Sequence, residues 1–230
     1  MNSRKINIGR CELGFRPRIA AIIDREMPIS RIHELTREGV DLFEMRIDLM
    51  EMPLETTVEF LEKVHAARIP SIGTLRETET NRQKRLDICR EILPFVDALD
   101  VELGSPLAEK IHAMTQGKII IVSEHDFEKT PDIPALKDMV DRSIRQGAHI
   151  VKIAAMANDR SDITRLLRFT EDTDVPMVSI SMGPLGTISR VLAPLFGSLY
   201  SYAFVHGSVA PGQLPVKDLA AYFKQLYPEI

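Results

Sequence analysis

A lysine interrupts one of the most apolar stretches of the chain. Lys152 stands in the run Val-Lys-Ile-Ala at 151–154, with apolar neighbours on both sides. A buried ammonium either finds a counter-charge or loses its proton, and a neutral amine can form a Schiff base with a ketone. The alternative is a lysine whose alkyl stem packs on a helix while its ammonium reaches solvent. Lys152 is therefore a candidate nucleophile.

A histidine ends the apolar run that precedes this lysine. The segment 123–126 reads SEHD, and strand alternation turns His125 to one face and Glu124 and Asp126 to the other. This distribution makes a poor metal cluster. A single imidazole titrates near neutrality and can act as both acid and base. If the two strands are neighbours about 4.8 Å apart, His125 and Lys152 can reach the same substrate.

Three charges alternate with apolar residues in another run. Glu44, Arg46 and Asp48 occupy every second position of FEMRID at 43–48, which puts all three on one face of a strand. The simplest interpretation is a strand face exposed to solvent. In a barrel, however, one strand face meets the helices and the other the interior, so this pattern favours a functional site.

Further cationic and amide side chains follow other apolar runs. Arg76 ends the third run, where the alternative is an arginine that reaches solvent from a strand end. The segment 181–190 (SMGPLGTISR) reads as a glycine loop and a helix start capped by a hydroxyl, a pattern that could hold a phosphate. Arg190 suggests a bidentate grip on a carboxylate or phosphate. Gln213 follows a Pro-Gly turn in APGQ at 210–213, where it either caps the turn or contacts a ligand.

Eight short apolar, β-branched runs could position these side chains. They are 18–24, 42–49, 70–76, 98–103, 118–127, 149–156, 176–182 and 201–205. Helical patterns separate them, without a long linker or repeat. The count predicts an α/β fold, a (β/α)8 or TIM barrel, with 1–230 as a single domain and the site at the carboxyl ends of the strands. A doubly wound open sheet is the alternative, but no glycine-rich turn follows the first run.

The clearest helical pattern is 134–148. Leu136, Met139, Val140 and Ile144 fall on one face there, and Gly147 offers a stop. The segments 162–173 and 215–227 have the same periodicity.

Composition excludes several classes of protein. The 230 residues contain 29 Lys and Arg, 33 Asp and Glu, 6% aromatic residues and no Trp, so nucleic acid is not an expected partner. Cys11 and Cys89 lie far apart, which argues against a zinc site or a disulfide framework and fits a reducing, cytoplasmic location. We expect no signal peptide and no membrane span, because no apolar run approaches about 18 residues.

Taken in order, these motifs resemble those of one family. The set FEMRID, TLR, SEHDFEKTP, VKIA, SMGPLGTISR and APGQ is similar to type I 3-dehydroquinate dehydratase, over almost the whole chain. Each string alone is weak, whereas SEHDF, VKIA and APGQ at these separations are jointly specific. The resemblance implies a Schiff-base hydro-lyase of the shikimate pathway, with a small-molecule substrate and without a metal or organic cofactor. It also implies a homodimer.

The resemblance assigns roles to individual residues. It implies that Lys152 attacks the C3 ketone of 3-dehydroquinate, and that His125 removes a proton from C2 and then protonates the leaving C1 hydroxyl. The implied substrate-binding residues are Glu44, Arg46, Arg76, Arg190 and Gln213, and the implied supporting residues are Asp48, Met182 and Ser208. Like-charge repulsion from Arg46 and Arg76 is expected to favour the neutral form of Lys152.

Two positions depart from the pattern of the family. A loop glutamate that helps to orient the histidine is replaced by Thr80, so either Glu77 or Glu79 substitutes for it or His125 is oriented in another way. A serine of the last motif is replaced by Val209, next to Ser208. The polar segment 77–85 is expected to be a mobile lid.

Two other functions compete with the dehydratase. A Schiff-base aldolase acting on a sugar phosphate would use the segment 181–190 to bind phosphate, an idea that Arg190 argues against. A barrel without catalytic activity, kept as a small-ligand-binding or interaction protein, would explain the missing loop glutamate. Turnover that is lost in Lys152→Ala would exclude the second alternative.

Overall fold

The computed structural model describes residues 5–115 and 117–228 and confirms all eight predicted strands. They are β3 (Ile19–Ile23), β4 (Leu42–Arg46), β5 (Ser71–Thr74), β6 (Ala98–Glu102), β7 (Ile119–Asp126), β8 (Ile150–Met156), β9 (Met177–Met182) and β10 (Ser201–Phe204). They form a parallel sheet in the order of the chain, with the two-residue strand β11 (Leu214–Pro215) added beside β10.

The sheet curls so that its last and first strands approach each other. β10 pairs with β3, and a parallel bridge joins Met177 of β9 to Ser198, just before β10. The amide of Leu199 donates to the carbonyl of Met177 at 2.9 Å, and the amide of Ser179 donates to Oγ of Ser198 at 3.1 Å. The predicted TIM-barrel fold is therefore confirmed.

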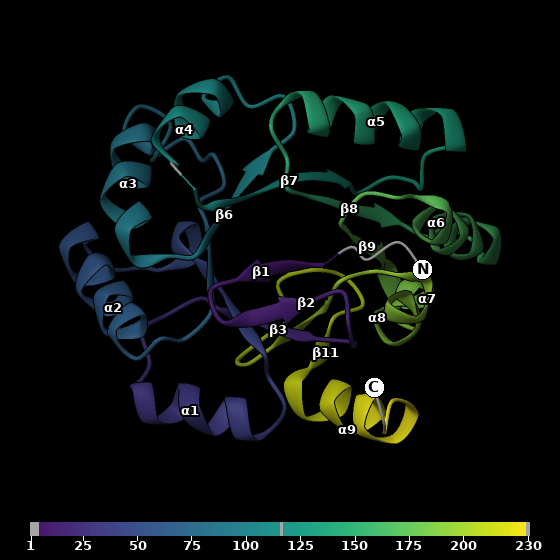
Figure 1. The fold of residues 1–230 in the computed structure, drawn as a ribbon, viewed down its shortest axis with the longest axis horizontal. Coiled ribbons are helices and arrows are strands. Elements are labelled where there is room, and N and C mark those ends of the chain that lie inside the picture. The colour runs from purple at the N-terminus through teal and green to yellow at the C-terminus, as the bar shows by residue number, and fades with distance from the viewer. Residues whose placement is uncertain (1–4, 116, 229–230) are drawn as a thin grey trace.

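Helices surround the sheet, one after another in chain order (Figure 1). They are α1 (Ile29–Arg37), α2 (Leu54–Ala66), α3 (Arg85–Ile92), α4 (Ala108–Met114), α5 (Ile133–Arg145), α6 (Arg160–Asp172), α7 (Gly183–Gly186), α8 (Ser189–Leu192) and α9 (Val216–Leu226). The 3-10 turns are η1 (Ile47–Leu49), η2 (Leu93–Phe95) and η3 (Ala193–Phe196). In the described part of the chain, no helix combines the length and apolarity needed to cross a bilayer.

Helix α5 corrects one detail of the predicted amphipathic face. Leu136 and Val140 are buried as expected, but Ile144 is 46% exposed and Ser143 is buried in its place. Ser143 satisfies its hydroxyl by donating to the carbonyl of Met139 at 2.8 Å, so a polar side chain can occupy the helix–sheet contact. Gly147 follows the helix with φ +91°, the left-handed conformation that ends a helix at low cost.

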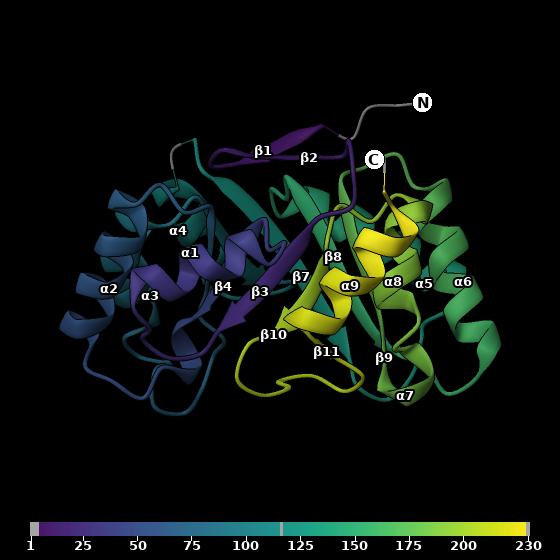
Figure 2. The ribbon, with the colours of Figure 1, turned by 90° about the horizontal axis from the view of Figure 1, so that it is seen from below.

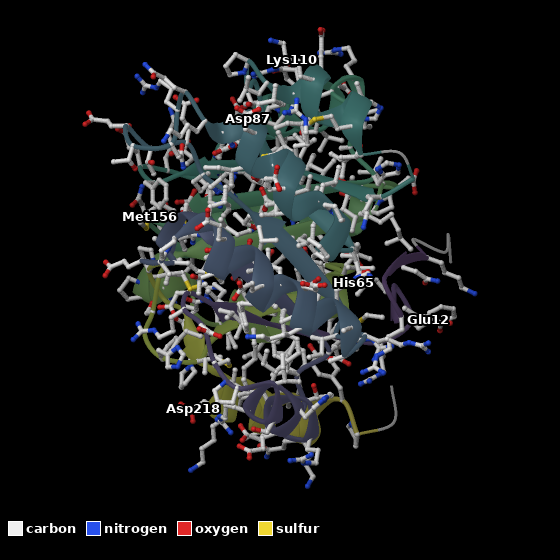
Figure 3. All side chains as sticks on the ribbon, turned by 90° about the vertical axis from the view of Figure 1, so that its left-hand side faces the viewer. Glu12, His65, Asp87, Lys110, Met156 and Asp218 are labelled. Atoms are coloured by element: carbon white, nitrogen blue, oxygen red, sulfur yellow. The ribbon has the colours of Figure 1, made fainter. Side chains whose placement is uncertain are left out.

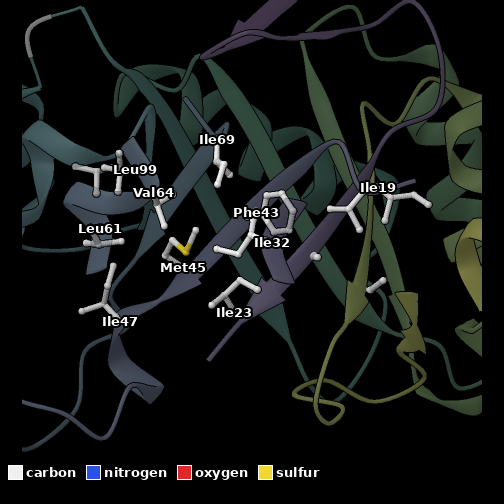
Figure 4. Close-up of a cluster of buried hydrophobic side chains, with 14 of the residues drawn as sticks. Ile19, Ile23, Ile32, Phe43, Met45, Ile47, Leu61, Val64, Ile69 and Leu99 are labelled. Carbon is white, nitrogen blue, oxygen red and sulfur yellow. The ribbon is translucent and has the colours of Figure 1, made fainter. Parts of the chain in front are cut away.

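Strand alternation separates an outer from an inner core. On β4, Phe43 and Met45 pack outward against α1 and α2, where Figure 4 shows them among Ile32 and Val64. Leu42, Glu44 and Arg46 face the barrel interior instead. The period-two pattern therefore places Glu44 and Arg46 in the interior, as the sequence predicts.

A hairpin that the sequence did not reveal closes one end of the barrel. Strands β1 (Ile6–Ile8) and β2 (Cys11–Leu13) pair antiparallel, and Ile8, Cys11 and Leu13 are buried in the inner core. Figure 2 shows this hairpin across the end opposite to the carboxyl ends of β3 and β10. In Figure 3, Glu12 of the hairpin and Met156 at the end of β8 accordingly lie on opposite sides. The open end is therefore the one where the barrel strands finish.

The hairpin is expected to contribute measurably to stability. Leu13→Ala removes a completely buried side chain from the inner core, and such a cavity lowers the free energy of unfolding by about 2–5 kcal/mol. Urea unfolding followed by circular dichroism measures the change. Glu12→Ala is the matched control, because Glu12 is exposed on the same strand and its loss should change stability by less than about 0.5 kcal/mol. Equal effects of the two changes would contradict the proposed packing role.

Candidate active site

A cavity of about 440 Å³ opens at the carboxyl ends of the strands. Eight of the ten residues that the sequence analysis singled out line it, namely Glu44, Arg46, Arg76, His125, Lys152, Met182, Arg190 and Gln213. Asp48 and Ser208 are not among its lining residues. Within the described residues, no group of three or more His, Cys, Asp or Glu side chains is arranged to hold a metal ion.

Lys152 lies at the bottom of this cavity and is held by three oxygen atoms. Its side chain is only 5% exposed. Nζ donates to Asp100 Oδ2 at 3.0 Å, to Glu44 Oε1 at 3.3 Å and to the hydroxyl of Tyr202 at 3.0 Å. The candidate nucleophile therefore rests as an ammonium whose three protons all have acceptors.

The charge around Lys152 is opposite to the sequence expectation. Burial and Arg76 lower the pKa of Lys152, but Asp100 and Glu44 outweigh them, so its pKa is raised. Arg76 therefore acts in the predicted direction, but the two carboxylates outweigh it and the lysine is not kept neutral. The reason is that Arg46 pairs with Asp48 and Arg76 with Asp100, while Asp100 and Glu44 also contact Nζ directly.

Asp100 is the main counter-charge, and the sequence analysis missed it. Its side chain is completely buried, accepts from Ser123 Oγ at 2.6 Å and lies 3.0 Å from Arg76 Nη2. Burial opposes the anion, yet Arg76, Lys152 and Ser123 hold the pKa of Asp100 well below its ordinary value. The sequence did contain a signal for this residue. Asp100 stands between the apolar residues Leu99 and Val101 in β6, just as Glu44 stands between apolar residues in β4.

Removing the charge of Asp100 should destabilise the protein. Asp100→Asn leaves Arg76 and Lys152 with one carboxylate fewer, and breaking a buried ion pair costs about 3–5 kcal/mol of unfolding free energy. Because the folded-state pKa is depressed, this stability is present at neutral pH and is lost as pH falls through that pKa. Urea unfolding at pH 7 and in acid should therefore show a difference from wild type that shrinks on acidification.

The exposed pair of Asp87 with Arg90 offers the control for this change. Asp87→Asn should alter stability by less than about 1 kcal/mol, because exposed ion pairs contribute little. An Asp100→Asn protein as stable as the Asp87→Asn protein would show that the buried network is not needed for folding.

His125 lies beside Lys152 on the neighbouring strand. In the β7–β8 register Ser123 pairs with Lys152 and His125 pairs with Ala154, so His125 stands one inward position nearer the carboxyl ends of the strands than Lys152. Burial and the positive charges of Lys152 and Arg76 lower the pKa of His125 to about 3. The imidazole is therefore neutral at physiological pH and can accept a proton.

In the part of the chain that the structure describes, no carboxylate hydrogen-bonds His125 in place of the missing loop glutamate. Among the described residues, neither Glu77 nor Glu79 hydrogen-bonds the imidazole, and Glu77 instead accepts from Arg82 at 2.8 Å. The ring of Phe127 stacks beside His125, with centroids 6.1 Å apart and planes 16° from parallel. Of the three sequence alternatives, the structure supports a histidine oriented in another way.

The predicted lid segment is tied to the ends of the strands. Asn81 Nδ2 donates to the carbonyl of Arg76 at 2.8 Å, and Asn81 Oδ1 accepts from the amide of Thr78 at 2.9 Å. Arg85, whose side chain is 3% exposed, donates to the carbonyl of Leu75 and pairs with Glu102. These contacts anchor both ends of the turn, and its mobility stays a prediction.

Arg190 and Gln213 line the cavity from the segments that follow β9 and β10. The guanidinium of Arg190 donates to the carbonyls of Gly212 at 2.8 Å and Pro211 at 3.1 Å. Gly212 has φ +72°, and a Cβ there would lie 2.3 Å from the carbonyl oxygen of Gly183, so only glycine fits this turn. Gln213 accepts from the amide of Val209 at 3.1 Å. Its Nε2 is buried without a partner in the described residues, and it can donate to a ligand in the cavity.

Two supporting residues lie elsewhere than predicted. Asp48 is not on β4 but in η1, where it pairs with Arg46 at 2.6 Å. It orients Arg46 from behind the cavity wall. Ser208 is exposed and donates to the carbonyl of Ala210 at 2.7 Å, so it shapes the loop rather than lining the cavity. Val209 lines the cavity instead.

The segment 181–190 is more compact than the predicted open glycine loop. It forms α7 and α8, and neither helix has a side-chain cap. Ser189 is not a cap, because its hydroxyl contacts the backbone of Ser181. The two-helix arrangement presents Arg190 to the cavity and gives no support to the phosphate loop required by the aldolase alternative.

Comparison with known proteins gives one consistent family. The family model described as Type I 3-dehydroquinase matches residues 21–229. The 3-dehydroquinate dehydratase of Methanococcoides burtonii is 36% identical over 93% of this chain and 96% of that protein, and the enzyme of Aquifex aeolicus is 32% identical over 91% and 98%. The solved type I 3-dehydroquinate dehydratase of Clostridium difficile, with covalently modified comenic acid, superposes with a TM-score of 0.83 at 27% identity, over 99% of both chains.

Proposed function

The chain belongs to the type I 3-dehydroquinate dehydratase family of hydro-lyases, and on this premise we propose that it converts 3-dehydroquinate to 3-dehydroshikimate through a Schiff base on Lys152. The observation that carries the proposal is a buried lysine contacted by two carboxylates, beside a neutral histidine on the adjacent strand. An amine and a base so arranged suit proton abstraction next to a ketone.

The first step needs the free amine of Lys152. Asp100 is already engaged by Arg76 and Ser123, whereas the one further partner of Glu44 among the described residues is the hydroxyl of Thr74, at 2.7 Å. Glu44 is therefore the better acceptor for the ammonium proton. The amine then attacks the C3 carbonyl, and the resulting carbinolamine loses its hydroxyl as water when that proton returns. The product of this step is a cationic imine.

The second step is the elimination. The imine draws electrons from the adjacent C2–H bond, so a neutral base can remove that proton. His125 is unprotonated at neutral pH, since its pKa is lowered to about 3 by burial and by nearby positive charge. The same imidazolium can return the proton to the C1 hydroxyl as it leaves as water. Hydrolysis of the product imine regenerates Lys152.

The charged cavity walls provide the binding contacts for the substrate. Arg190 is assigned to the substrate carboxylate, because its guanidinium is fixed by two backbone carbonyls and lines the cavity. Gln213 also lines the cavity, and its buried amide nitrogen Nε2 has no partner in the described residues. Arg46, Arg76 and Glu44 are assigned to the ring hydroxyls. The pathway served would be the shikimate pathway, and a cytoplasmic homodimer stays a prediction of the family resemblance.

An ultraviolet assay combined with chemical trapping tests the proposal. Purified protein and 3-dehydroquinate should give the absorbance of the conjugated enone product. Borohydride added during turnover should reduce the imine and leave a ligand-sized mass increase on Lys152, located by peptide mass spectrometry. A folded protein that gives neither product nor adduct would contradict the proposal and favour the aldolase or the binding-protein alternative.

A further inference from the structure

A tyrosine that the sequence analysis did not single out contacts the proposed nucleophile. Tyr202 of β10 is 2% exposed, and its hydroxyl is the third acceptor of Lys152 Nζ, at 3.0 Å. Its ring also lies under the ammonium, with Nζ 4.3 Å from the ring centroid. Tyr200, 1% exposed, is the neighbour of Tyr202 in the inner core, with the two hydroxyl oxygens 3.4 Å apart.

The three acceptors of Lys152 differ in what they can do after deprotonation. An ammonium has three N–H donors, whereas the free amine has two donors and one lone pair. Asp100, as an anion, can only accept, so it cannot face that lone pair favourably. Glu44 can donate only while it carries the proton taken from the ammonium, and it must return that proton when the carbinolamine loses water. A phenol can both accept and donate. Of the three groups that contact Nζ, Tyr202 is therefore the one that can bond both states of the lysine without gaining or losing a proton itself.

We propose that Tyr202 is a positioning residue for Lys152, whose hydroxyl accepts a hydrogen bond from the ammonium and donates one to the free amine. Tyr200 completes the exchange, because its hydroxyl can accept from Tyr202 in the first state and donate to it in the second. This inference rests on the proposed function, in which Lys152 must pass between these two states in each turnover.

The surroundings keep the phenol protonated and able to exchange roles. Burial, together with the negative charges of Glu44 and Asp100, raises the pKa of Tyr202 well above its ordinary value. The hydroxyl therefore does not become a third anion beside Nζ. Tyr202 also lines the cavity, whereas Asp100 is completely enclosed.

Tyr202→Phe isolates the hydroxyl, because the ring and its contact with Nζ remain. The charged ammonium loses more than the neutral amine when an acceptor is removed, so the pKa of Lys152 should fall. The trapping rate should fall on the acid side of its pH profile, where Lys152 stays protonated. In Tyr202→Phe we expect this acid limb of the profile to shift to lower pH by about half to one unit, the scale of one hydrogen bond. We also expect kcat to fall about three- to tenfold and KM to change by less than about twofold, since the amine is less well positioned.

The measurement is rapid-quench trapping of the complete protein with 3-dehydroquinate and cyanoborohydride across a pH series, with kcat and KM determined in parallel. Tyr227→Phe is the matched control. Tyr227 is also buried, and its hydroxyl makes one hydrogen bond, to the carbonyl of Val191 at 2.6 Å. That contact is not part of the cavity wall, so this variant should keep the wild-type limb even if its melting temperature falls.

The outcomes separate the two proposals. A wild-type protein that is never trapped on Lys152 overturns the proposed function and this inference together. If wild type is trapped on Lys152, and Tyr202→Phe has the same kcat and the same acid limb of the trapping profile as wild type, this inference alone is overturned. An acid limb that shifts equally in Tyr227→Phe and Tyr202→Phe also overturns this inference, because the shift would then be a general consequence of lost stability.

Discussion

Lys152→Gln is expected to abolish the borohydride-trapped adduct and to reduce turnover by on the order of 10⁴-fold or more. Glutamine is close to lysine in length and can still donate to Asp100 and Glu44 through its amide. It cannot form an imine, however, so the route through a covalent intermediate is lost. The measurement is the rate of enone formation, with intact-mass analysis after reduction.

The control for this change is a lysine far from the cavity. Lys110 is exposed on α4, where Figure 3 labels it at the edge of the molecule, and Lys110→Gln should retain both adduct and turnover. Circular dichroism and urea unfolding establish that the Lys152→Gln protein is folded, since Asp100 and Glu44 lose their cationic partner. A folded Lys152→Gln protein that turns over near the wild-type rate would show that the reaction does not pass through this amine.

His125→Asn is expected to slow the elimination by about 10²- to 10⁴-fold, the usual contribution of a positioned acid or base. Imine formation should continue, because Lys152 keeps its partners. The species trapped on Lys152 should therefore differ between wild type and His125→Asn. Wild type traps a mixture that includes the product imine, whereas His125→Asn should accumulate the adduct of intact substrate, which is heavier by one water. Intact mass after rapid quench distinguishes the two species.

The resting state of His125 adds a pH test to this prediction. Because its pKa is lowered to about 3 by burial, Lys152 and Arg76, the free enzyme should show no loss of kcat/KM near pH 6 from this group. His33→Asn is the control, since His33 lies on α1 outside the cavity wall. Equal turnover in His125→Asn and His33→Asn would remove the acid–base role from His125.

These two expectations depend on features that are local in the sequence. Strand alternation is a property of consecutive residues, so the interior positions of Lys152, His125, Glu44 and Arg46 could be predicted from their apolar neighbours. The order of strands in a parallel barrel follows the chain. That order predicts from the sequence alone that His125 and Lys152 lie on adjacent strands.

The sequence signals failed where an element is short or leaves its regular geometry. The three-residue strands β1 and β2 are too brief for a recognisable period, yet they cover one end of the barrel. Asp48 fits the alternation of β4 in the sequence. In the structure the chain turns into η1 after Arg46, and Asp48 does not line the cavity. Local pattern indicates a strand but does not define where the strand ends.

Electrostatics was decided only by the tertiary structure. Glu44, Asp100 and Tyr202 lie 108, 52 and 50 residues from Lys152 in the chain and within 3.3 Å of its Nζ in space. Charge interactions depend on distance and burial, neither of which a single sequence specifies. The sequence by itself therefore identified the lysine, the histidine and the barrel that carries them. Closure of the barrel determined that carboxylates, rather than arginines, dominate the lysine, and that a tyrosine contacts it.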